Sequence, residues 1–573
     1  MIHILKHLYK IIVIARRVPD AWLLITLQLA SGVAGVVGLP LLIPILKMLE
    51  GKTIGQLADP ILNFINKGMV LIGIEPSFHS ILATMSFLVI GSIMLDASVV
   101  LLGQFNQYQL YADSSIKLLN GYLHVRWPWM VKHHSGEMNH ALYNEAAAWS
   151  ETVFQSLRLI ATTIQAVSYL IVALYVSWKG SFAAAIVLAV LITSNLLLSQ
   201  RIKTISSQKN TKQKEFAEFV QTIQQNRKFL KSSMLYQAIK NRYNGMVEML
   251  VRQARGMAWR TQIQRAWAQS CIFLILVSLL VFHKSLHLGY AELIVLFAAF
   301  TRMLPQITAI SADYAAFASK IPVYEALEER TDQLEAEKEV YGSEKYISDS
   351  VIRFEHVNFS YSNGRQILLD LNLEIPPNKT VAIIGVSGEG KSTILDLLLG
   401  LWQPESGTIR YGMVSHKALD YKSFRSKVAY VSQETTLFSG TFRENLLVGS
   451  PDGGEEHLNQ VLDVVQLSDM VQKLPDGLET LVGENGIRMS VGQRQRVGLA
   501  RSLLMQPEIL ILDEATSALD LKTEGEILDV LFNRLHHKMT ILIVTHRAST
   551  VKYADYVYVL EDGRVMQRAE VKV

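Results

Sequence analysis

A glycine-rich segment, "GVSGEGKST" at residues 385–393, contains the residue types and spacing that most directly imply chemistry. From Gly385 to Ser392 it matches the phosphate-binding pattern G-x-x-x-x-G-K-[ST]. The segment follows an apolar run, "TVAII", and opens a helical pattern, which is the strand–loop–helix context that such a loop needs. Glycines let backbone N–H groups turn towards phosphates, and a helix N-terminus favours negative charge. We therefore expect Lys391 to reach the β- and γ-phosphates of a nucleotide and the Ser392 hydroxyl to ligate Mg²⁺.

A pair of acidic residues lies further along the chain, in "ILILDEATSALD" at residues 509–520. Asp513 falls at the end of a buried strand, where its carboxylate could hold Mg²⁺ directly or through water. Glu514 follows immediately and could orient or deprotonate an attacking water. An isolated pair of this kind is usually two surface acids. Downstream of a phosphate-binding loop, it favours a site for nucleotide hydrolysis.

The elements that would position these residues can be recognised between residues 351 and 573. The segment "VIRFEHVNFSY" alternates as strands do, and "TVAIIGV", "EILILD" and "MTILIVT" read as short buried strands. They alternate with helical patterns, which is typical of a largely parallel α/β sheet covered on both faces. The sequence therefore predicts an α/β P-loop NTPase domain over residues 351–573.

The first half of the chain has a different composition. Hydrophobic residues make up 50% of the 573 residues and concentrate before residue 310. A helix of about 20 apolar residues crosses a membrane, and six stretches approach or exceed that length. The sixth stretch is the least convincing as a span. We nevertheless expect it to cross the membrane, because an even number of crossings places both termini on the cytosolic side, and a basic N-terminus favours that side. The predicted spans are about 22–46, 80–103, 159–177, 181–199, 266–282 and 289–310.

Long inner loops separate several of these spans. Their helical pattern predicts that helices 2 to 5 continue far into the cytosol and turn at about 133–144 and 222–231. The charged segment 327–350 reads as a linker, so the transmembrane domain is expected at 1–326. The basic, amphipathic first 20 residues predict a helix on the cytosolic membrane surface.

Charge and cysteine usage exclude other classes. The net charge is +4, and no basic run with interleaved aromatic residues suggests nucleic-acid binding. The one cysteine, Cys271, excludes an intrachain disulfide and weighs against an attached cysteine-peptidase domain. Asp96, Arg302 and Gln306 fall within or beside apolar spans and could face a central cavity, where they either contact cargo or pair with other residues.

Taken together, the motifs resemble the nucleotide-binding domain of the ATP-binding cassette (ABC) family. The phosphate-binding loop, "YVSQ" with Gln433, "SVGQRQR", "LDEATSALD" and "VTH" with His546 follow one another in that family's order. Six preceding membrane helices with long inner loops resemble the exporter arrangement of the same family. The resemblance implies an α-helical six-helix transmembrane domain with long cytosolic extensions, followed by an ABC cassette.

The resemblance also implies a role for individual positions. Glu514 would be the general base, His546 would contact the γ-phosphate, and Gln433 would contact Mg²⁺ and the attacking water. Tyr361 would stack on adenine, and "GENG" at 483–486 would touch the inner loops. The residues expected to bind ATP are Tyr361, Gly385, Ser387, Gly388, Glu389, Gly390, Lys391, Ser392, Thr393, Ser490, Gly492, Gln493 and Asp520. Those expected to hold Mg²⁺ are Ser392, Gln433 and Asp513.

The signature segment departs from the family pattern at two positions, Met489 and Val491. The usual residues are Leu, Ser, Gly, Gly and Gln, and here they are Met489, Ser490, Val491, Gly492 and Gln493. The phosphate contacts implied by resemblance come from the Ser490 hydroxyl and the Gly492 N–H, which both remain. We expect Val491 to have an ordinary negative φ, which a β-branched residue tolerates.

By the same resemblance, the signature completes the ATP site of a partner, which is a second copy of the chain or a related half-transporter. The implied function is ATP-driven export or flipping of an amphipathic solute across the bacterial inner membrane by alternating access. The cargo could be a peptide, a lipid-linked molecule or a drug-like compound. Two short segments, "GLPLLIPILKML" and "RMLPQITAISADYAAF", resemble bacterial flippases for lipid-linked oligosaccharides. An ATP-gated channel or regulator on the same scaffold is the alternative.

Overall fold

The computed structural model describes most of the chain. The described residues are 2–49, 77–133, 135–182, 226–286, 288–361, 364–386, 388–450, 454–482, 489–517, 521–535 and 538–570, with single residues between 63 and 75 and between 212 and 224. The chain divides into two compact units, which are described separately. The first comprises Met1–His124 and His134–Ala336, and the second comprises Val125–His133 and Glu337–Val573.

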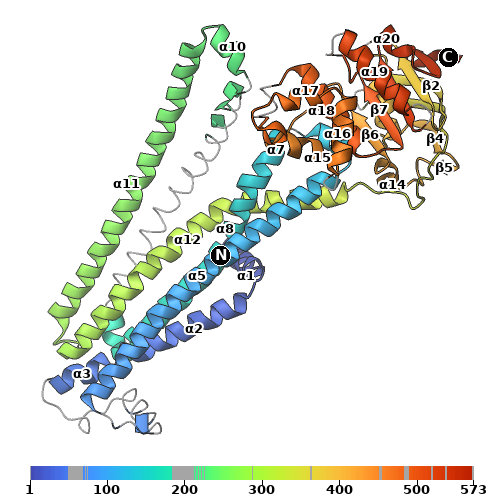
Figure 1. The fold of residues 1–573 in the computed structure, drawn as a ribbon. Helices are drawn as coiled ribbons and strands as arrows, with labels where there is room; N and C mark the ends of the chain where they lie inside the picture. Colours follow the sequence, from blue (N-terminus) through green and yellow to red (C-terminus); the bar gives the residue numbers. More distant parts are fainter. Residues whose placement is uncertain are drawn as a thin grey trace. The chain divides into compact units, whose positions relative to one another are not determined.

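The first unit is built from long helices (Figure 1). Among the described residues, four helices are long and apolar enough to cross a membrane, namely Ala21–Leu49, Phe78–His124, Gly136–Val176 and Tyr290–Ala336, and Gln269–Phe282 is a shorter apolar stretch. They match five of the six predicted spans, whereas the predicted span 181–199 lies almost entirely outside the described residues. The helices are α1 (Ile2–Ala15), α2 (Ala21–Gly38), α3 (Leu42–Leu49), α5 (Phe78–His124), α7 (Ser135–His140), the π-helix η2 (Ala141–Glu145), α8 (Ala146–Val176), α10 (Arg227–Ser232), α11 (Tyr236–Phe282) and α12 (Tyr290–Ala336).

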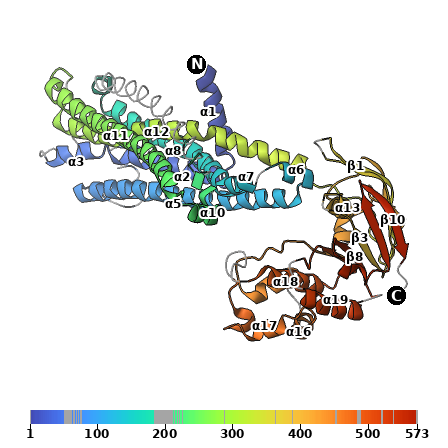
Figure 2. The same ribbon diagram turned by 90° about the horizontal axis from the view of Figure 1, so that it is seen from above.

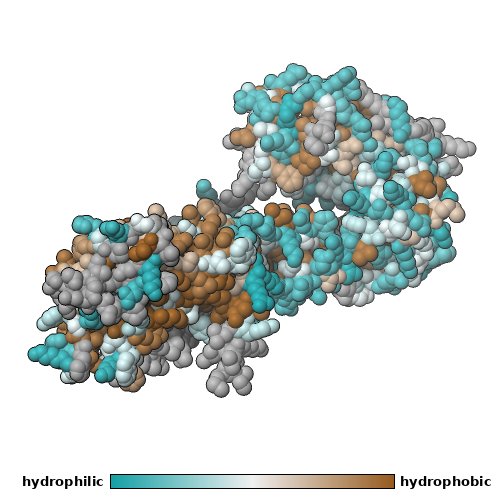
Figure 3. All heavy atoms as spheres, turned by 90° about the horizontal axis from the view of Figure 1, so that it is seen from below, coloured by the Kyte–Doolittle hydropathy of each residue, from teal (hydrophilic) through white to brown (hydrophobic). Residues whose placement is uncertain are grey.

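The surface of this unit is consistent with burial in lipid. Hydrophobic side chains gather over the helical unit in the space-filling view (Figure 3). They include exposed residues of the apolar part of α5, such as Phe87, Ile90 and Met94. Apolar surface of this kind is stable only when it faces lipid or another protein.

The inner loop between α5 and α8 turns earlier than the sequence predicts. The expected turn at 133–144 is wrong in position, since helix α5 ends at His124 and a short helix, α6 (Trp127–Lys132), precedes α7. The break occurs because Val125 forms a β-bridge with Lys338 and the Arg126 N–H donates to the Glu337 carbonyl at 2.9 Å. These backbone groups therefore pair outside the helix, as buried or half-buried amides must. The second predicted turn, 222–231, coincides with α10.

The predicted linker also differs in detail. Helix α12 continues to Ala336, because Leu327 and Leu334 are buried and supply the apolar face that the sequence did not reveal. Beyond it, the chain lies against the cassette, where the Gly342 N–H donates to the Leu419 carbonyl at 2.9 Å. A Cβ on Gly342 would lie 2.0 Å from the Ala418 carbonyl oxygen, so the close approach requires glycine.

The strands described in the second unit form two sheets. The four-stranded sheet is antiparallel, with the order β2-β1-β4-β5, and had not been predicted as a separate sheet. Its strands are β1 (Ile352–Ser360), β2 (Gln366–Ile375), β4 (Ser406–Tyr411) and β5 (Val414–Ser415). The six-stranded sheet has the order β10-β9-β3-β8-β7-β6 and is parallel except at β9–β10, as the sequence predicts. Its strands are β3 (Thr380–Ile384), β6 (Val428–Val431), β7 (Ile509–Asp513), β8 (Thr540–Thr545), β9 (Tyr556–Glu561) and β10 (Arg564–Glu570).

Helices cover both faces of the larger sheet, as expected. Helix α13 (Lys391–Leu398) lies between the two sheets and buries Ile394, Leu397 and Leu398 there. The opposite face packs against the helices α15 (Phe442–Leu447), α16 (Glu455–Val464), α17 (Ser468–Gln472), α18 (Val491–Leu504) and α19 (Leu521–Leu535). Figure 2 shows α16, α17, α18 and α19 together on one side of the sheet. Because β3, β8 and β7 are neighbours and parallel, the residues after them meet at one edge of the sheet.

Candidate nucleotide-binding site

The phosphate-binding loop connects β3 to α13. Gly388 and Gly390 have φ values of +91° and +104°, a region that L-residues rarely adopt. A Cβ on Gly390 would also approach the Ile367 Cγ2 to 2.9 Å, and one on Gly385 would lie 2.6 Å from the Leu560 carbonyl oxygen. Glycine is therefore required for two reasons, the positive φ at Gly388 and Gly390 and the close packing at Gly385 and Gly390.

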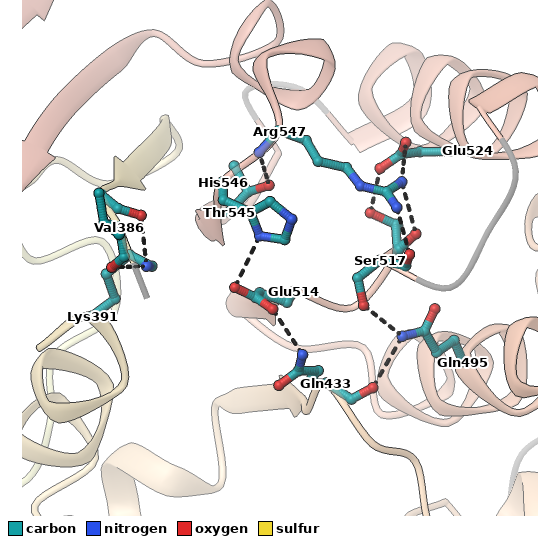
Figure 4. A network of polar contacts seen from close by, with 12 residues as sticks. Val386, Lys391, Gln433, Gln495, Glu514, Ser517, Glu524, Thr545, His546 and Arg547 are labelled. Atoms are coloured by element: carbon teal, nitrogen blue, oxygen red, sulfur yellow. Dashed lines mark hydrogen bonds and ion pairs between the residues drawn. The ribbon is translucent and has the colours of Figure 1, made fainter. Parts of the chain in front are cut away.

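The loop lysine points back into the loop (Figure 4). The Lys391 ammonium donates to the carbonyls of Gly385 and Val386, each at 2.8 Å, and the side chain is buried. It is therefore placed at the centre of the turn that would enclose phosphates. Ser392 is exposed in the first turn of α13, and the Thr393 hydroxyl lies 3.0 Å from the Tyr361 hydroxyl.

Glu514 is held from two sides at the end of β7. The Gln433 amide donates to one carboxylate oxygen at 2.9 Å, and His546 Nδ1 lies 3.1 Å from the other (Figure 4). The three residues come from three segments, after β6, β7 and β8, so the sheet topology brings them together. Glu514 also has a φ of +47°, a left-handed conformation that costs of order 1 kcal/mol for a residue with a side chain. Its N–H donates to the Val544 carbonyl at 2.9 Å, which fixes this conformation.

Asp513 is the last residue of β7 and is buried. Burial raises the pKa of its carboxyl group and the neighbouring Glu514 charge adds to this, while a hydrogen bond from the Tyr430 hydroxyl and the Lys391 charge act in the opposite direction. Tyr430 donates to Oδ2 at 2.8 Å, and within the described ranges no other side-chain donor reaches this carboxylate, so Oδ1 could accept another ligand. Burial, reinforced by the Asp513 charge, raises the pKa of Asp396 on α13 to about 6.

The expected adenine-stacking residue belongs to an aromatic group at the margin of the four-stranded sheet. The Tyr361 ring makes edge contacts with Phe359 and Trp402, with ring centroids 5.0 and 5.2 Å apart. Its hydroxyl group is tethered to Thr393 in the loop helix. Tyr361 is therefore adjacent to the helix that follows the loop.

The signature segment begins helix α18. Ser490 is the N-cap and forms a capping box with Gln493, in which the Gln493 N–H donates to the Ser490 hydroxyl at 3.1 Å and the Ser490 N–H to the Gln493 side chain at 2.9 Å. Val491 is the first helical residue, is half exposed and does not have a positive φ. The valine therefore sits where a β-branched residue is tolerated, as expected from the sequence, and Gly492 follows it in the first turn.

The expected site residues fall into three groups by position. Ser387, Asp520 and the segment 483–486 lie outside the described residues. Gly385, Gly388, Glu389 and Gly390 lie together in the loop before Lys391, and Gln433, Asp513, Glu514 and His546 lie together at the strand ends. Ser490, Gly492 and Gln493 form a separate cluster at the start of α18.

Sequence reasoning missed three residues that brace the strand ends. Arg547 pairs with buried Glu524 at 2.8 Å and donates to the Ser517 carbonyl (Figure 4). Buried Gln495 on α18 donates to the Gln433 carbonyl at 3.0 Å and to the Ser517 hydroxyl at 3.3 Å. Gln495 thus ties the signature helix to the segment that carries Gln433. Gln495 lies within "SVGQRQR" and Arg547 directly follows "VTH", whereas Glu524 belongs to no motif, and spacing alone gave no partner for any of the three.

In the helical unit, Asp96 is surrounded by uncharged donors. Ser31 and Gln28 of α2 donate to Oδ1 at 2.6 and 3.2 Å, and Gln165 of α8 donates to Oδ2. The positively charged Arg302 on α12 also interacts electrostatically with the Asp96 carboxylate. These contacts cross-link three helices and favour the paired, structural role for Asp96 over cargo contact.

Comparisons with known proteins agree with this architecture. Residues 368–517 match the family described as ABC transporter. The chain is 42% identical over 217 residues to the uncharacterized ABC transporter ATP-binding protein y4gM of Sinorhizobium fredii, covering 38% of this chain and 37% of that protein. It is 33% identical over 408 residues to the ATP-dependent permease MDL1 of Candida albicans, covering 69% of this chain and 59% of that protein. The aligned region thus spans less than two thirds of either relative.

A solved structure, described as a bacterial Atm1-family ABC exporter with ATP bound, matches with a TM-score of 0.74. The match covers 97% of this chain and 95% of that one at 21% sequence identity, so it establishes the fold.

A membrane-spanning helical domain followed by a cassette with this loop, acid pair and signature helix defines the exporter type of ABC transporter. Residues 368–517 match this family, the chain as a whole has the fold of such an exporter, and it is an integral multi-pass membrane protein. More particularly, it joins one transmembrane domain to one C-terminal ABC ATPase domain, the arrangement of a half-transporter.

Proposed function

We propose that the chain binds and hydrolyses ATP at the edge where β3, β7 and β8 end, and that hydrolysis drives export or flipping of an amphipathic solute. One observation supports this proposal most directly. Glu514, in a left-handed conformation beside the phosphate-binding loop, has both carboxylate oxygens hydrogen-bonded, one by Gln433 and one by His546. An acid held in this way is oriented for proton transfer.

Each residue would have its own role in ATP binding or hydrolysis. Backbone N–H groups of the loop and the Lys391 ammonium bind the phosphates, which requires Lys391 to exchange its two carbonyl partners for phosphate oxygens. Tyr361 stacks on the adenine ring. Glu514 accepts a proton from the attacking water, and His546 turns from the Glu514 carboxylate towards the γ-phosphate.

The residues around the loop also fit a magnesium ion. Mg²⁺ prefers oxygen ligands and usually retains waters and phosphate oxygens, so few protein ligands are needed. The exposed Ser392 hydroxyl, the free Oδ1 of Asp513 and the Gln433 side chain supply such oxygens. Among the described residues, no group of three or more His, Cys, Asp or Glu side chains is placed to hold a metal alone. When bound, the ion would neutralise charge on the phosphates.

A complete ATP site requires a second cassette. By family resemblance, Ser490 and Gly492 complete the site of a partner, which is a second copy or a related half-transporter. ATP binding would close two cassettes head to tail, and hydrolysis would let them part, switching the access of the helices.

The membrane placement follows from charge. Lys10, Arg16 and Arg17 near the N-terminus favour a cytosolic start, and an even number of crossings returns the cassette to the cytosol. We propose the inner membrane of a bacterium as the location. The apolar surface of the helices favours a cargo that partitions into lipid, in the class of peptides, lipid-linked molecules or drug-like compounds.

A screen of candidate solutes for stimulation of ATP hydrolysis tests the proposal, with the purified full chain reconstituted in lipid. We expect at least one amphipathic class to raise the rate, and the Glu514→Gln variant to abolish both basal and stimulated hydrolysis. A parental protein that does not hydrolyse ATP under any of these conditions would overturn the proposal.

A further inference from the structure

Tyr430 is the first residue of the "YVSQ" motif, but the family resemblance assigns a role there only to Gln433. It lies on β6, the edge strand of the six-stranded sheet, which pairs in parallel with β7 in the register Tyr430↔Ile511. Its neighbours Ala429 and Val431 belong to the core on one face of the sheet, whereas Val428 belongs to the core on the face that α13 covers. Because side chains alternate along a strand, Tyr430 lies on the α13 face, towards the loop.

From that face, the Tyr430 hydroxyl reaches the end of the neighbouring strand. It donates a hydrogen bond to Asp513 Oδ2 at 2.8 Å, although the Tyr430 side chain itself is 44% exposed. Asp513 is only 8% exposed, so water has little access to its carboxylate and a protein donor takes its place. Within the described part of the chain, the Tyr430 hydroxyl is the side-chain donor that approaches this carboxylate within hydrogen-bonding distance.

A carboxylate with one oxygen occupied presents the other in a defined direction. Metal-ligating carboxylates in proteins are commonly hydrogen-bonded by outer groups, and loss of such a group weakens metal binding by about 10–100-fold. We propose that Tyr430 is a positioning residue for magnesium. Its hydroxyl fixes the Asp513 carboxylate through Oδ2, which would leave Oδ1 available as a ligand when Asp513 and Ser392 hold Mg²⁺. This proposal rests on the proposed ATP site and adds a residue to it.

The surroundings explain why one fixed orientation matters. Asp396 on α13 lies close enough for the Asp513 charge to act on its carboxyl group and for its own charge to act on Tyr430. Without the hydroxyl donor, the Asp513 carboxylate would keep the neighbouring Glu514 charge but lose the hydrogen bond that orients it. The hydrogen bond selects one rotamer before the ion arrives, which reduces the entropy lost on binding.

The test is a magnesium titration of nucleotide binding, made in the full-length Glu514→Gln background so that hydrolysis does not consume the nucleotide. The probe is a fluorescent ATP analogue, and the readout is the Mg²⁺ concentration at half-maximal change. Tyr430→Phe removes only the hydroxyl. The matched control is Tyr553→Phe, which removes another tyrosine–aspartate hydrogen bond, to Asp529, far from the loop in the sequence and on other elements.

We expect Tyr430→Phe to raise the Mg²⁺ midpoint by about 10-fold or more, with nucleotide binding in EDTA and the melting temperature unchanged, and Tyr553→Phe to leave the midpoint within twofold. A midpoint for Tyr430→Phe within twofold of the parent would overturn the proposal. So would a lowered midpoint, because it would mean that the hydroxyl competes with the ion. Failure of the Glu514→Gln parent to bind the nucleotide at any Mg²⁺ concentration would instead overturn the proposed ATP site itself.

Discussion

The Gln433 amide nitrogen lies 2.9 Å from Oε2 of Glu514, joining the segment after the edge strand β6 to the end of β7. Gln433 is thereby coupled to the acid that we propose as general base, while Gln495 of the signature helix holds the Gln433 carbonyl. A displacement of either segment would turn the Glu514 carboxylate. This relationship gives a physical basis for coupling hydrolysis to movement of the cassette.

Removal of the Gln433 amide should slow hydrolysis without preventing nucleotide binding. Gln433→Leu leaves Glu514 with the His546 contact alone, so the carboxylate is less well oriented. Since a positioned general base contributes about 10²–10⁴-fold, we expect the hydrolysis rate to fall by roughly 10–100-fold, with ATP affinity within about threefold. Phosphate release and equilibrium binding, measured on the same preparation, check this. An unchanged hydrolysis rate would show that the contact has no catalytic role.

Val491 should tolerate replacement, whereas its neighbour should not. Val491 begins α18 with negative φ and a half-exposed side chain, so Val491→Gly should change ATP hydrolysis by only a few fold. Gly492→Asp places a negative charge in the first turn, where the partner's phosphates are expected, and should nearly abolish hydrolysis. Steady-state ATP hydrolysis rates of the two variants test this prediction, and an equal loss of rate in both variants would contradict it.

The cassette should show a pH-dependent stability that originates at Asp396. Its pKa is raised from 3.8 to about 6 in the folded chain, so the folded state favours the protonated form more than the unfolded state does. Stability is therefore lost as the pH rises through this range, and ionised Asp396 remains unfavourable at neutral pH. With EDTA and no nucleotide, Asp396→Asn should raise the melting temperature of the full chain more at pH 8 than at pH 4.5.

The size of that difference is limited because Asp396 is partly screened by solvent. We expect about 1–2 kcal/mol, corresponding to a few degrees in melting temperature. A stabilisation that is equal at both pH values, or larger at pH 4.5, would contradict the assignment.

The Arg547–Glu524 pair should be essential to the folding of the cassette. Glu524 is 1% exposed, and Arg547 is its ionic partner at 2.8 Å. Arg547→Met leaves a buried carboxylate without that partner, which costs roughly 3–5 kcal/mol. The double variant Arg547→Met/Glu524→Gln should recover part of the lost melting temperature, because the buried charge is then absent. A double variant no more stable than Arg547→Met alone would be the contrary result.

These contacts show which features of the site the amino-acid sequence could predict. The loop, the acid pair and the signature are short segments whose chemistry depends on neighbours in sequence, so Lys391 and Glu514 could be identified directly. The Tyr430–Asp513 and Arg547–Glu524 contacts join residues 83 and 23 positions apart, and nothing in their spacing fixes strand register.

In the helical unit, too, local sequence predicted the elements but not the contacts between distant residues. Apolar length predicted where helices would cross the membrane, because composition alone determines partitioning into lipid. The end of α12 was misplaced, since its charged surface concealed Leu327 and Leu334, which are buried by packing. The turn after α5 depends on pairing of Val125 with Lys338, more than 200 residues away, which no local pattern could indicate.

The most direct test of the central claim compares ATP hydrolysis and ATP binding in the full chain and in Glu514→Gln, both reconstituted in lipid. We predict Mg²⁺-dependent phosphate release by the parent, and a loss of about 10²-fold or more in the variant, with ATP affinity retained within threefold. Hydrolysis at the parental rate in Glu514→Gln would contradict the account, because the acid that Gln433 and His546 hold would then not be the general base.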